Sequence, residues 1–418
     1  MKHIYTSVDI GSDTIKVVTA ELHKNKLNLL AATSVKSRGI KKGLIVDVRE
    51  ATSSLKQAIN EIELMLGIPI RKVIASVPSY FAEYDKVSAS IDIVTRETGE
   101  LKPIDGKDVV KVLQTAIMTK LSTNKEMITI LPIGFKVDGK SVRDPKGIVG
   151  SKLEASGIMV TAPKKNIYSV ITLIENIGIE VVDISTDSIG CIYAFKNKEL
   201  DKQVGAIINI GAETTTVSIY NRGIIIKNSI IQLGGRNIDN DIAYIYKTNL
   251  DESKDIKEKF ALAHKMYASS NEVTEVNTFD GKKIKVNQLE LSEICMSRLE
   301  EILTLAKKEI NILSSRLVDY IIITGGTSNF ANFNYIADEV FNKKITIGNI
   351  KLVGIRNNKY AACVGNIVYF ISKLKLKGQS YTMVSERDED DLISAHRNGI
   401  NISNDTMLGK VFGYFFSE

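Results

Sequence analysis

The stretch VDIGSDTIKV at residues 8–17 has a counterpart, INIGAETTTV, at residues 208–217. In each stretch a glycine separates two runs of β-branched and apolar residues, a pattern that predicts a strand, a tight turn and a second strand. Aligned without gaps, Gly11 faces Gly211 and Thr14 faces Thr214. Because the copies lie about half a chain apart, they predict a duplicated domain whose two hairpins face one another. Two unrelated hairpins in a β-rich protein are the alternative.

The sequence around the hairpins alternates between helical and extended patterns. Some segments repeat apolar residues with the helical period, and short β-branched runs lie between them. This alternation predicts an α/β fold in which sheets and helices form layers. The predicted helices are 166–177, 188–196, 291–313 and 332–341, and the predicted strands are 180–184 and 320–326.

Two segments interrupt the α/β pattern. Residues 81–159 contain short strands and a helical pattern at 107–121, which predicts an inserted subdomain. Residues 232–317 are mostly helical in pattern, with one hairpin turn predicted at Asp280–Gly281.

The composition is that of a soluble globular protein. The 418 residues are 44% hydrophobic and 25% charged, which argues against a disordered or collagen-like chain. The net charge of +6 is spread along the chain without a polybasic block, so no nucleic-acid partner is expected.

Three cysteines without CxxC spacing predict buried thiols in a reducing compartment, and four scattered histidines do not predict a metal site. The sequence also shows no signal peptide and no run of about 18 apolar residues that would span a bilayer.

The character of the chain changes near its C-terminus. Residues 377–404 are polar and include the acidic run ERDEDD, which predicts a flexible linker. Residues 405–418 predict a short amphipathic helix, which is too short to span a membrane. A bilayer surface, a partner groove or the protein's own domain could cover its apolar face. Against a bilayer, one such helix supplies about 3–7 kcal/mol, so a polymer would attach more firmly than a monomer. The apolar face consists of Met407, Leu408, Val411, Phe412, Phe415 and Phe416.

The two hairpins and a later glycine pair carry groups that suit a nucleotide. Asp9 can hold Mg²⁺ through water, the turn at Gly11 and Ser12 can present amide groups to an anion, and Lys16 can reach the phosphates. No Walker P-loop is present. Further candidates are Gly211, Thr214 and Thr215 of the second hairpin, and Gly325 and Gly326 after the apolar strand.

These motifs, in this order, resemble those of the actin-like ATPase superfamily. VDIGSDTIK (8–16) and INIGAETTTVSIY (208–220) resemble its two phosphate loops, and IIITGGTSNF (321–330) resembles its adenosine motif. Within the superfamily the sequence is most similar to the FtsA family of bacterial cell-division proteins. That similarity also covers RGIKKGLIVD (38–47), VIASVPSYF (73–81), DPKGIVGSKLE (144–154), IQLGGRNIDNDIA (231–243), SRLEEIL (297–303) and YAACVGNI (360–367).

The resemblance implies an actin-like, ribonuclease H-like pair of domains with an inserted FtsA-type subdomain and a C-terminal amphipathic helix. One lobe would comprise residues 1–80, 160–198 and 360–376, and the other 199–231 and 318–359. Residues 81–159 would be the inserted subdomain on the side opposite to that of actin, and 232–317 the helical subdomain. Additional nucleotide-binding residues implied by the resemblance are Asn209, Gly234, Gly235, Lys257 and Arg298.

The resemblance also implies a function. Such a protein would bind ATP and Mg²⁺ between its lobes and self-associate into filaments. It would bind the C-terminal tail of FtsZ through the helical subdomain and recruit other divisome proteins. It would lie at the division site as a peripheral protein on the cytoplasmic face of the membrane, attached to membrane lipids by its C-terminal helix.

The sequence departs from the family pattern at the second loop. Where the superfamily has Asp-x-Gly-Gly-Gly, this chain has Asn209, Gly211, Ala212 and Glu213. An asparagine orients water less strongly than a carboxylate, so we expect ATP binding with slow or no hydrolysis. The family's Ala-Glu-x-x-Lys helix keeps only Lys257.

Two other functions are open to a chain of this pattern. One is an actin-like assembly ATPase of the type IV pilus kind, which shares the inserted-subdomain plan. The other is a small-molecule kinase of the same fold, although no acidic base facing a substrate cleft is evident in the sequence.

Overall fold

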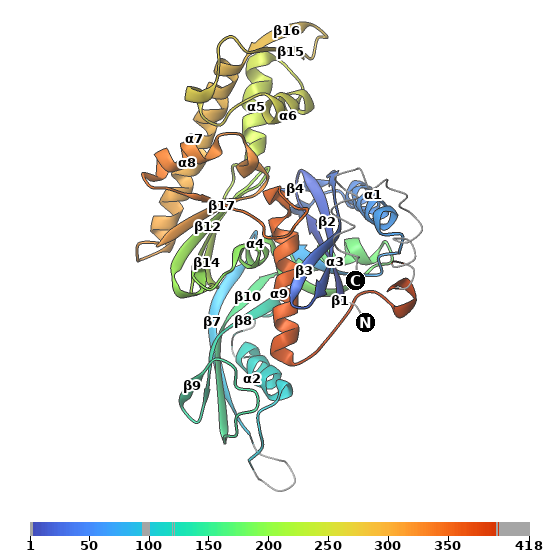
Figure 1. The fold of residues 1–418 in the computed structure, drawn as a ribbon, viewed down its shortest axis with the longest axis vertical. Coiled ribbons are helices and arrows are strands. Elements are labelled where there is room, and N and C mark those ends of the chain that lie inside the picture. Colours follow the sequence, from blue (N-terminus) through green and yellow to red (C-terminus); the bar gives the residue numbers. More distant parts are fainter. Residues whose placement is uncertain (1–2, 94–100, 119, 121, 390–391, 393–418) are drawn as a thin grey trace.

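The computed structural model describes residues 3–93, 101–118, 120, 122–389 and 392. Two five-stranded sheets form the two lobes of the molecule (Figure 1). The first has the order β11-β6-β1-β2-β3, and the second β14-β13-β12-β17-β18. The strands of the first sheet are β1 (His3–Ile10), β2 (Thr14–His23), β3 (Lys26–Lys36), β6 (Lys72–Val77) and β11 (Glu180–Thr186). The strands of the second sheet are β12 (Val204–Ile210), β13 (Thr215–Asn221), β14 (Ile224–Ile231), β17 (Tyr320–Thr324) and β18 (Thr346–Ile347).

The two sheets have the same topology. In the first, β1 pairs antiparallel with β2 and parallel with β6, and β2 pairs antiparallel with β3. In the second, β12 pairs antiparallel with β13 and parallel with β17, and β13 pairs antiparallel with β14. The repeated hairpins therefore belong to two copies of one domain, and the alternative of two unrelated hairpins is excluded.

Helices cover both faces of each sheet. Helices α1 (Val48–Leu66) and α3 (Lys164–Glu175) pack on the outer face of the first sheet, while α4 (Asp187–Phe195) and α9 (Ala361–Lys377) lie between the two sheets. Along β12, Ile207 faces α4 and α9, whereas Ala206 and Ile208 face α7 (Gln288–Leu313) and α8 (Phe333–Phe341). This alternation is the two-residue period of a strand buried on both faces.

Helices α4 and α9 touch through their backbones. A Cβ atom on Gly365 would lie 1.6 Å from the carbonyl oxygen of Gly190. Only glycine fits there, since no side chain atom can be accommodated at that separation. The contact fixes α9 between the lobes, with its first turn beside the cavity described below.

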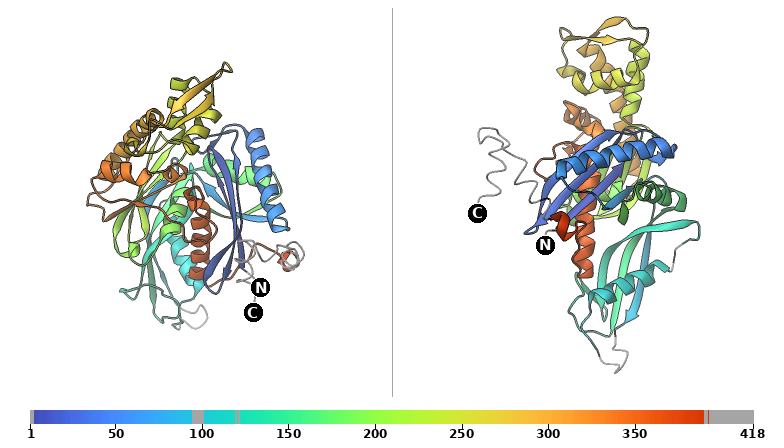
Figure 2. Two further views of the ribbon diagram at one scale, coloured as in Figure 1. Left: turned by 45° about the horizontal axis from the view of Figure 1, so that its top comes forward. Right: turned by 90° about the vertical axis from the view of Figure 1, so that its right-hand side faces the viewer.

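The inserted subdomain and the helical subdomain lie at opposite ends of the long axis (Figures 1 and 2). The inserted subdomain is the sheet β7-β10-β8-β9 with α2 packed on it. The helical subdomain contains α5 and α6 with the hairpin β15–β16. The remaining bounds are β7 (Glu83–Asp92), α2 (Gly106–Met118), β8 (Lys125–Val137), β9 (Lys140–Val142), β10 (Lys152–Pro163), α5 (Gly235–Tyr246), α6 (Leu250–Lys259), β15 (Val273–Asn277), β16 (Lys283–Asn287), and the small hairpin β4 (Ile40–Lys41) with β5 (Leu44–Ile45).

The segment after α9 differs from the predicted flexible linker over residues 378–389. Met383 is buried, its amide donates to the carbonyl of Ile4 at 3.0 Å, and Arg71 pairs with Asp388 at 3.6 Å. This part of the segment therefore packs on the first lobe beside β1. The burial of Met383 and the two polar contacts stabilise it in that position. The predicted amphipathic helix at 405–418 lies outside the described residues. Within the described part of the chain, no helix has the length and apolar character needed to cross a membrane.

Candidate functional site

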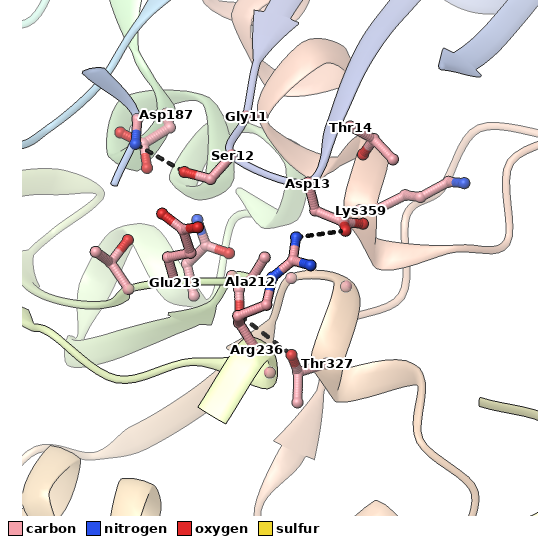
Figure 3. A pocket seen from close by; sticks show the side chains of 18 of the residues that line it. Gly11, Ser12, Asp13, Thr14, Asp187, Ala212, Glu213, Arg236, Thr327 and Lys359 are labelled. Carbon is pink, nitrogen blue, oxygen red and sulfur yellow. Dashed lines mark hydrogen bonds and ion pairs between the residues drawn. The ribbon is translucent and has the colours of Figure 1, made fainter. Parts of the chain in front are cut away.

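The two repeated hairpins form the same turn and face one cavity. The amide of Gly11 donates to the carbonyl of Thr14 at 3.2 Å, and the amide of Gly211 donates to that of Thr214 at 3.0 Å. Both turns line a cavity of about 440 Å³ between the lobes (Figure 3). The glycine pair after β17 and the start of α5 complete its wall. A site of this size, between two lobes and lined by two glycine turns, suits a nucleotide.

Most of the residues predicted for the site line this cavity, and three do not. Thr215 is buried and donates its hydroxyl to the carbonyl of Leu233, and Gly234 packs behind the second turn. Arg298 pairs with Asp241 on α5 at 2.7 Å and is not among the lining residues. The predicted residues that do line the cavity are Asp9, Gly11, Ser12, Lys16, Asn209, Gly211, Thr214, Gly235, Lys257, Gly325 and Gly326.

Asp9 and Lys16 form an ion pair at the floor of the first turn. They face one another across β1 and β2, and Lys16 Nζ lies 2.8 Å from Asp9 Oδ2. Their side chains are 14% and 11% exposed. Burial alone lowers the pKa of Lys16, but the charge and hydrogen bond of Asp9 outweigh it, so the pKa lies above its usual value. Lys16 therefore stays cationic beside the cavity.

The acidic groups fit a magnesium ion bound chiefly by phosphate and water. Asp9 and Asp187 both line the cavity, and Asp187 accepts the amide of Ser79 at 2.8 Å. Burial raises the pKa of Asp187, and the charge of Asp9 raises it further against the hydrogen bonds from Ser79. No cluster of three metal-binding side chains occurs among the residues the structure describes. A single carboxylate contacting hydrated Mg²⁺ needs no such cluster.

The glycine pair brings β17 against the second turn. Gly325 has φ of +96°, and a Cβ atom there would lie 2.4 Å from the carbonyl oxygen of Ile210 and 2.5 Å from Asn209 Oδ1. Glycine is required both by the backbone conformation and by this approach. The strand end therefore reaches the cavity as bare backbone.

The helical subdomain supplies a buried ion pair to the cavity wall. Lys257 Nζ lies 2.6 Å from Asp239 Oδ1, with side chains 8% and 4% exposed. Burial raises the pKa of Asp239, and Lys257 opposes that shift. Because the pair links α5 to α6, it fixes both helices at the cavity.

The structure adds charged residues that the sequence analysis did not select. Asp13 of the first turn pairs with Arg236 on α5 and Lys254 on α6, on the opposite side of the cavity. Burial acts to raise the pKa of Asp13, but the hydrogen bond and charge of Lys254, together with Arg236, hold it below its usual value. Within the described residues, the cavity is lined by the cations Lys16, Lys42, Arg236, Lys254, Lys257 and Lys359 and the acids Asp9, Asp13, Asp187, Glu213, Asp239 and Glu258.

Glu213, the unusual residue of the second turn, binds the opposite lobe. Its carboxylate accepts the amide of Lys42 at 2.6 Å, in the loop between β4 and β5. The amide of Gly43 in the same loop donates to Ser12 Oγ at 2.8 Å. The loop therefore joins the first turn to the second. The loop lies within RGIKKGLIVD (38–47), a segment that resembles the FtsA family. Nothing in the pattern of that segment predicts a contact with either turn.

Comparisons with known proteins identify similar sequences over most of the chain. The family model for the cell division protein FtsA matches residues 206–365, and the model for the SHS2 domain inserted in FtsA matches residues 84–161. The cell division protein FtsA of Bacillus subtilis (strain 168) is 28% identical over 398 residues, which cover 94% of this chain and 89% of that protein.

Solved structures share the fold at low sequence identity. A PilM–PilN type IV pilus biogenesis complex aligns with a TM-score of 0.60 at 12% identity, covering 87% of this chain and 98% of the matched chain. MreB5 of Spiroplasma citri bound to ADP aligns with a TM-score of 0.52 at 13% identity, covering 90% and 98%.

Proposed function

Because the chain belongs to the FtsA family and is an actin-like cell division protein, we propose that it binds ATP with Mg²⁺ between its lobes and connects FtsZ to the membrane. In this proposal it assembles into filaments, binds the C-terminal tail of FtsZ and recruits other divisome proteins. It lies at the division site on the cytoplasmic face of the membrane, held on the lipids by residues 405–418.

The matched pair of turns carries the nucleotide part of the proposal. Gly11 and Gly211 close the same hydrogen-bonded turn and face a single cavity from opposite lobes. Backbone amides in such turns favour anions, so the phosphates belong between them. The nucleotide bound to the similarly folded MreB5 supports this assignment.

In this proposal, different residues of the chain make different interactions with the nucleotide and its metal ion. Lys16 supplies a buried positive charge to the phosphates, and Asp9 is placed to hold the hydration shell of the metal. Bound Mg²⁺ would neutralise phosphate charge. Gly325 and Gly326 let the adenosine approach the backbone after β17, while Lys257 lines the wall from α6. The nucleotide then contacts both lobes and stabilises them in one arrangement.

The other functions considered receive no comparable support. The PilM–PilN structure is 12% identical, a likeness that concerns the fold alone. The similarity to FtsA also covers the inserted subdomain, which a small-molecule kinase would not need.

Calorimetric titration with ATP–Mg²⁺ tests the site assignment. Lys16→Ala should weaken binding about tenfold or more, because it removes a charge-assisted hydrogen bond to phosphate. Asp9→Ala should also weaken it. Lys26→Ala, a change of the same type at an exposed position at the start of β3, serves as the control and should bind as the wild type does. Equal affinity of all four proteins would refute the assignment.

A further inference from the structure

Asp13 places a carboxylate in front of two cations of the opposite lobe. Lys254 Nζ lies 2.6 Å from Asp13 Oδ2, and Arg236 Nη2 lies 3.2 Å from Asp13 Oδ1. Figure 3 shows Asp13 and Arg236 directed toward one another inside the cavity. Each carboxylate oxygen therefore takes one cation, and all three side chains are about a quarter exposed.

The position of Arg236 relates this cluster to the phosphate region. The backbone amide of Arg236 donates to the carbonyl of Ala212 at 2.6 Å, so its main chain rests on the second turn. Its side chain reaches the first turn at Asp13. The guanidinium consequently lies between the two turns, where the proposed function puts the nucleotide phosphates.

Arg236 and Lys254 can pair with either a carboxylate or a phosphate group. Guanidinium and ammonium groups pair with either anion through charge-assisted hydrogen bonds, and a guanidinium matches the oxygens of both. A nucleotide phosphate carries more negative charge than one carboxylate, so it can compete for both cations at close range. In the present structure the side chain of Asp13 occupies them.

We propose that Asp13 is an internal competitor of the nucleotide, which holds Arg236 and Lys254 until a phosphate group of the ligand displaces it. This inference rests on the proposed function. The site would then select a ligand with enough phosphate charge to replace the carboxylate. Asp13 would also hold the helical subdomain against the first lobe before the nucleotide binds.

Competition of this kind lowers the apparent affinity. The measured dissociation constant equals the intrinsic constant divided by the fraction of molecules in which both cations are available. Replacing Asp13 with a neutral residue should therefore strengthen binding, although most changes in a binding loop weaken it. Other contacts across the cleft remain, including Lys36 with Asp251 at 2.6 Å, so the lobes keep contact without Asp13.

The test compares nucleotide binding by the full chain and its variants with calorimetry, using ADP–Mg²⁺ and ATP–Mg²⁺. Asp13→Asn should lower the dissociation constants about 5–10-fold, the size expected when two partly exposed ion pairs no longer compete with the nucleotide. Removing a negative charge also strengthens anion binding in general. The same change is therefore made in a protein that already carries Arg236→Gln and Lys254→Gln, in which the gain should disappear. If Asp13→Asn does not fold, Asp13→Ser removes the same charge with a smaller side chain.

The outcomes separate this inference from the proposed function. An unchanged or weaker affinity of Asp13→Asn, with normal binding by the wild type, overturns the inference alone. A gain of equal size without Arg236 and Lys254 does the same, since it would reflect general repulsion. No binding of either nucleotide by the wild type would overturn the proposed function, and this inference with it.

Discussion

Two residues at the second hairpin, Asn209 at the end of β12 and Glu213 in the turn, bear on whether the proposed nucleotide site can hydrolyse ATP. Asn209 lines the cavity in place of the superfamily's aspartate, and Glu213 is engaged by the amide of Lys42. An amide cannot accept a proton, and it orients an attacking water less strongly than a carboxylate. Lys16 and Asp9, the residues proposed to bind the nucleotide, keep the identities expected for the first hairpin. We therefore expect ATP binding and ATP hydrolysis to be separable in this chain.

We expect slow hydrolysis on these grounds. Steady-state release of phosphate from ATP–Mg²⁺ should stay below about 1 s⁻¹, the lower end of the usual kinase range. Asn209→Asp should raise the rate while changing ATP affinity less, because it restores a carboxylate near the phosphates. A phosphate-release assay measures both proteins, and wild-type turnover above that limit would contradict the expectation.

Among the elements, α9 connects the cavity to the inserted subdomain. Ala362 in its first turn lines the cavity, and Leu376 in its last turn packs against the core of the inserted subdomain. In between, Gly365 lies against Gly190 of α4. Helix α9 therefore contacts both regions along its length.

Gly365→Ala tests how closely α9 must pack. The added methyl group would require α4 and α9 to separate, which should lower the free energy of unfolding by about 1–3 kcal/mol or more. Gly134→Ala is the control, since a Cβ atom there meets nothing within 4 Å. Chemical denaturation measures both, and equal stability of the two variants would show that the helices can shift freely.

The whole molecule is an elongated body with its subdomains at opposite ends (Figure 2). Residues 378–389 pack on the first lobe beside β1, and Leu392 is buried in the core of the same lobe. If residues 405–418 attach to lipid, the position of this segment sets which side of the molecule faces the membrane.

Truncation after Ile402 tests attachment at this scale. The shortened protein should lose flotation with liposomes, because it lacks the apolar face at 405–418, and should bind ATP as the full chain does. The full chain should also carry a peptide of the FtsZ C-terminal tail into the floating fraction. Flotation that persists after truncation would place the membrane site elsewhere in the chain.

The sequence by itself determined the two hairpins, the α/β layers and the glycine pair, because these follow from local apolar periods and from turns that need glycine. The pairing of Asp9 with Lys16 is also local in origin, because the two residues face one another across one hairpin. Only the tertiary structure decided which distant side chains share the cavity. Asp13 and Lys254 are 241 residues apart, and they meet because the lobes and the helical subdomain pack around a common cleft. The same holds for residues 378–389, whose polar composition predicts a linker, whereas the pocket beside β1 that buries Met383 exists only in the folded chain.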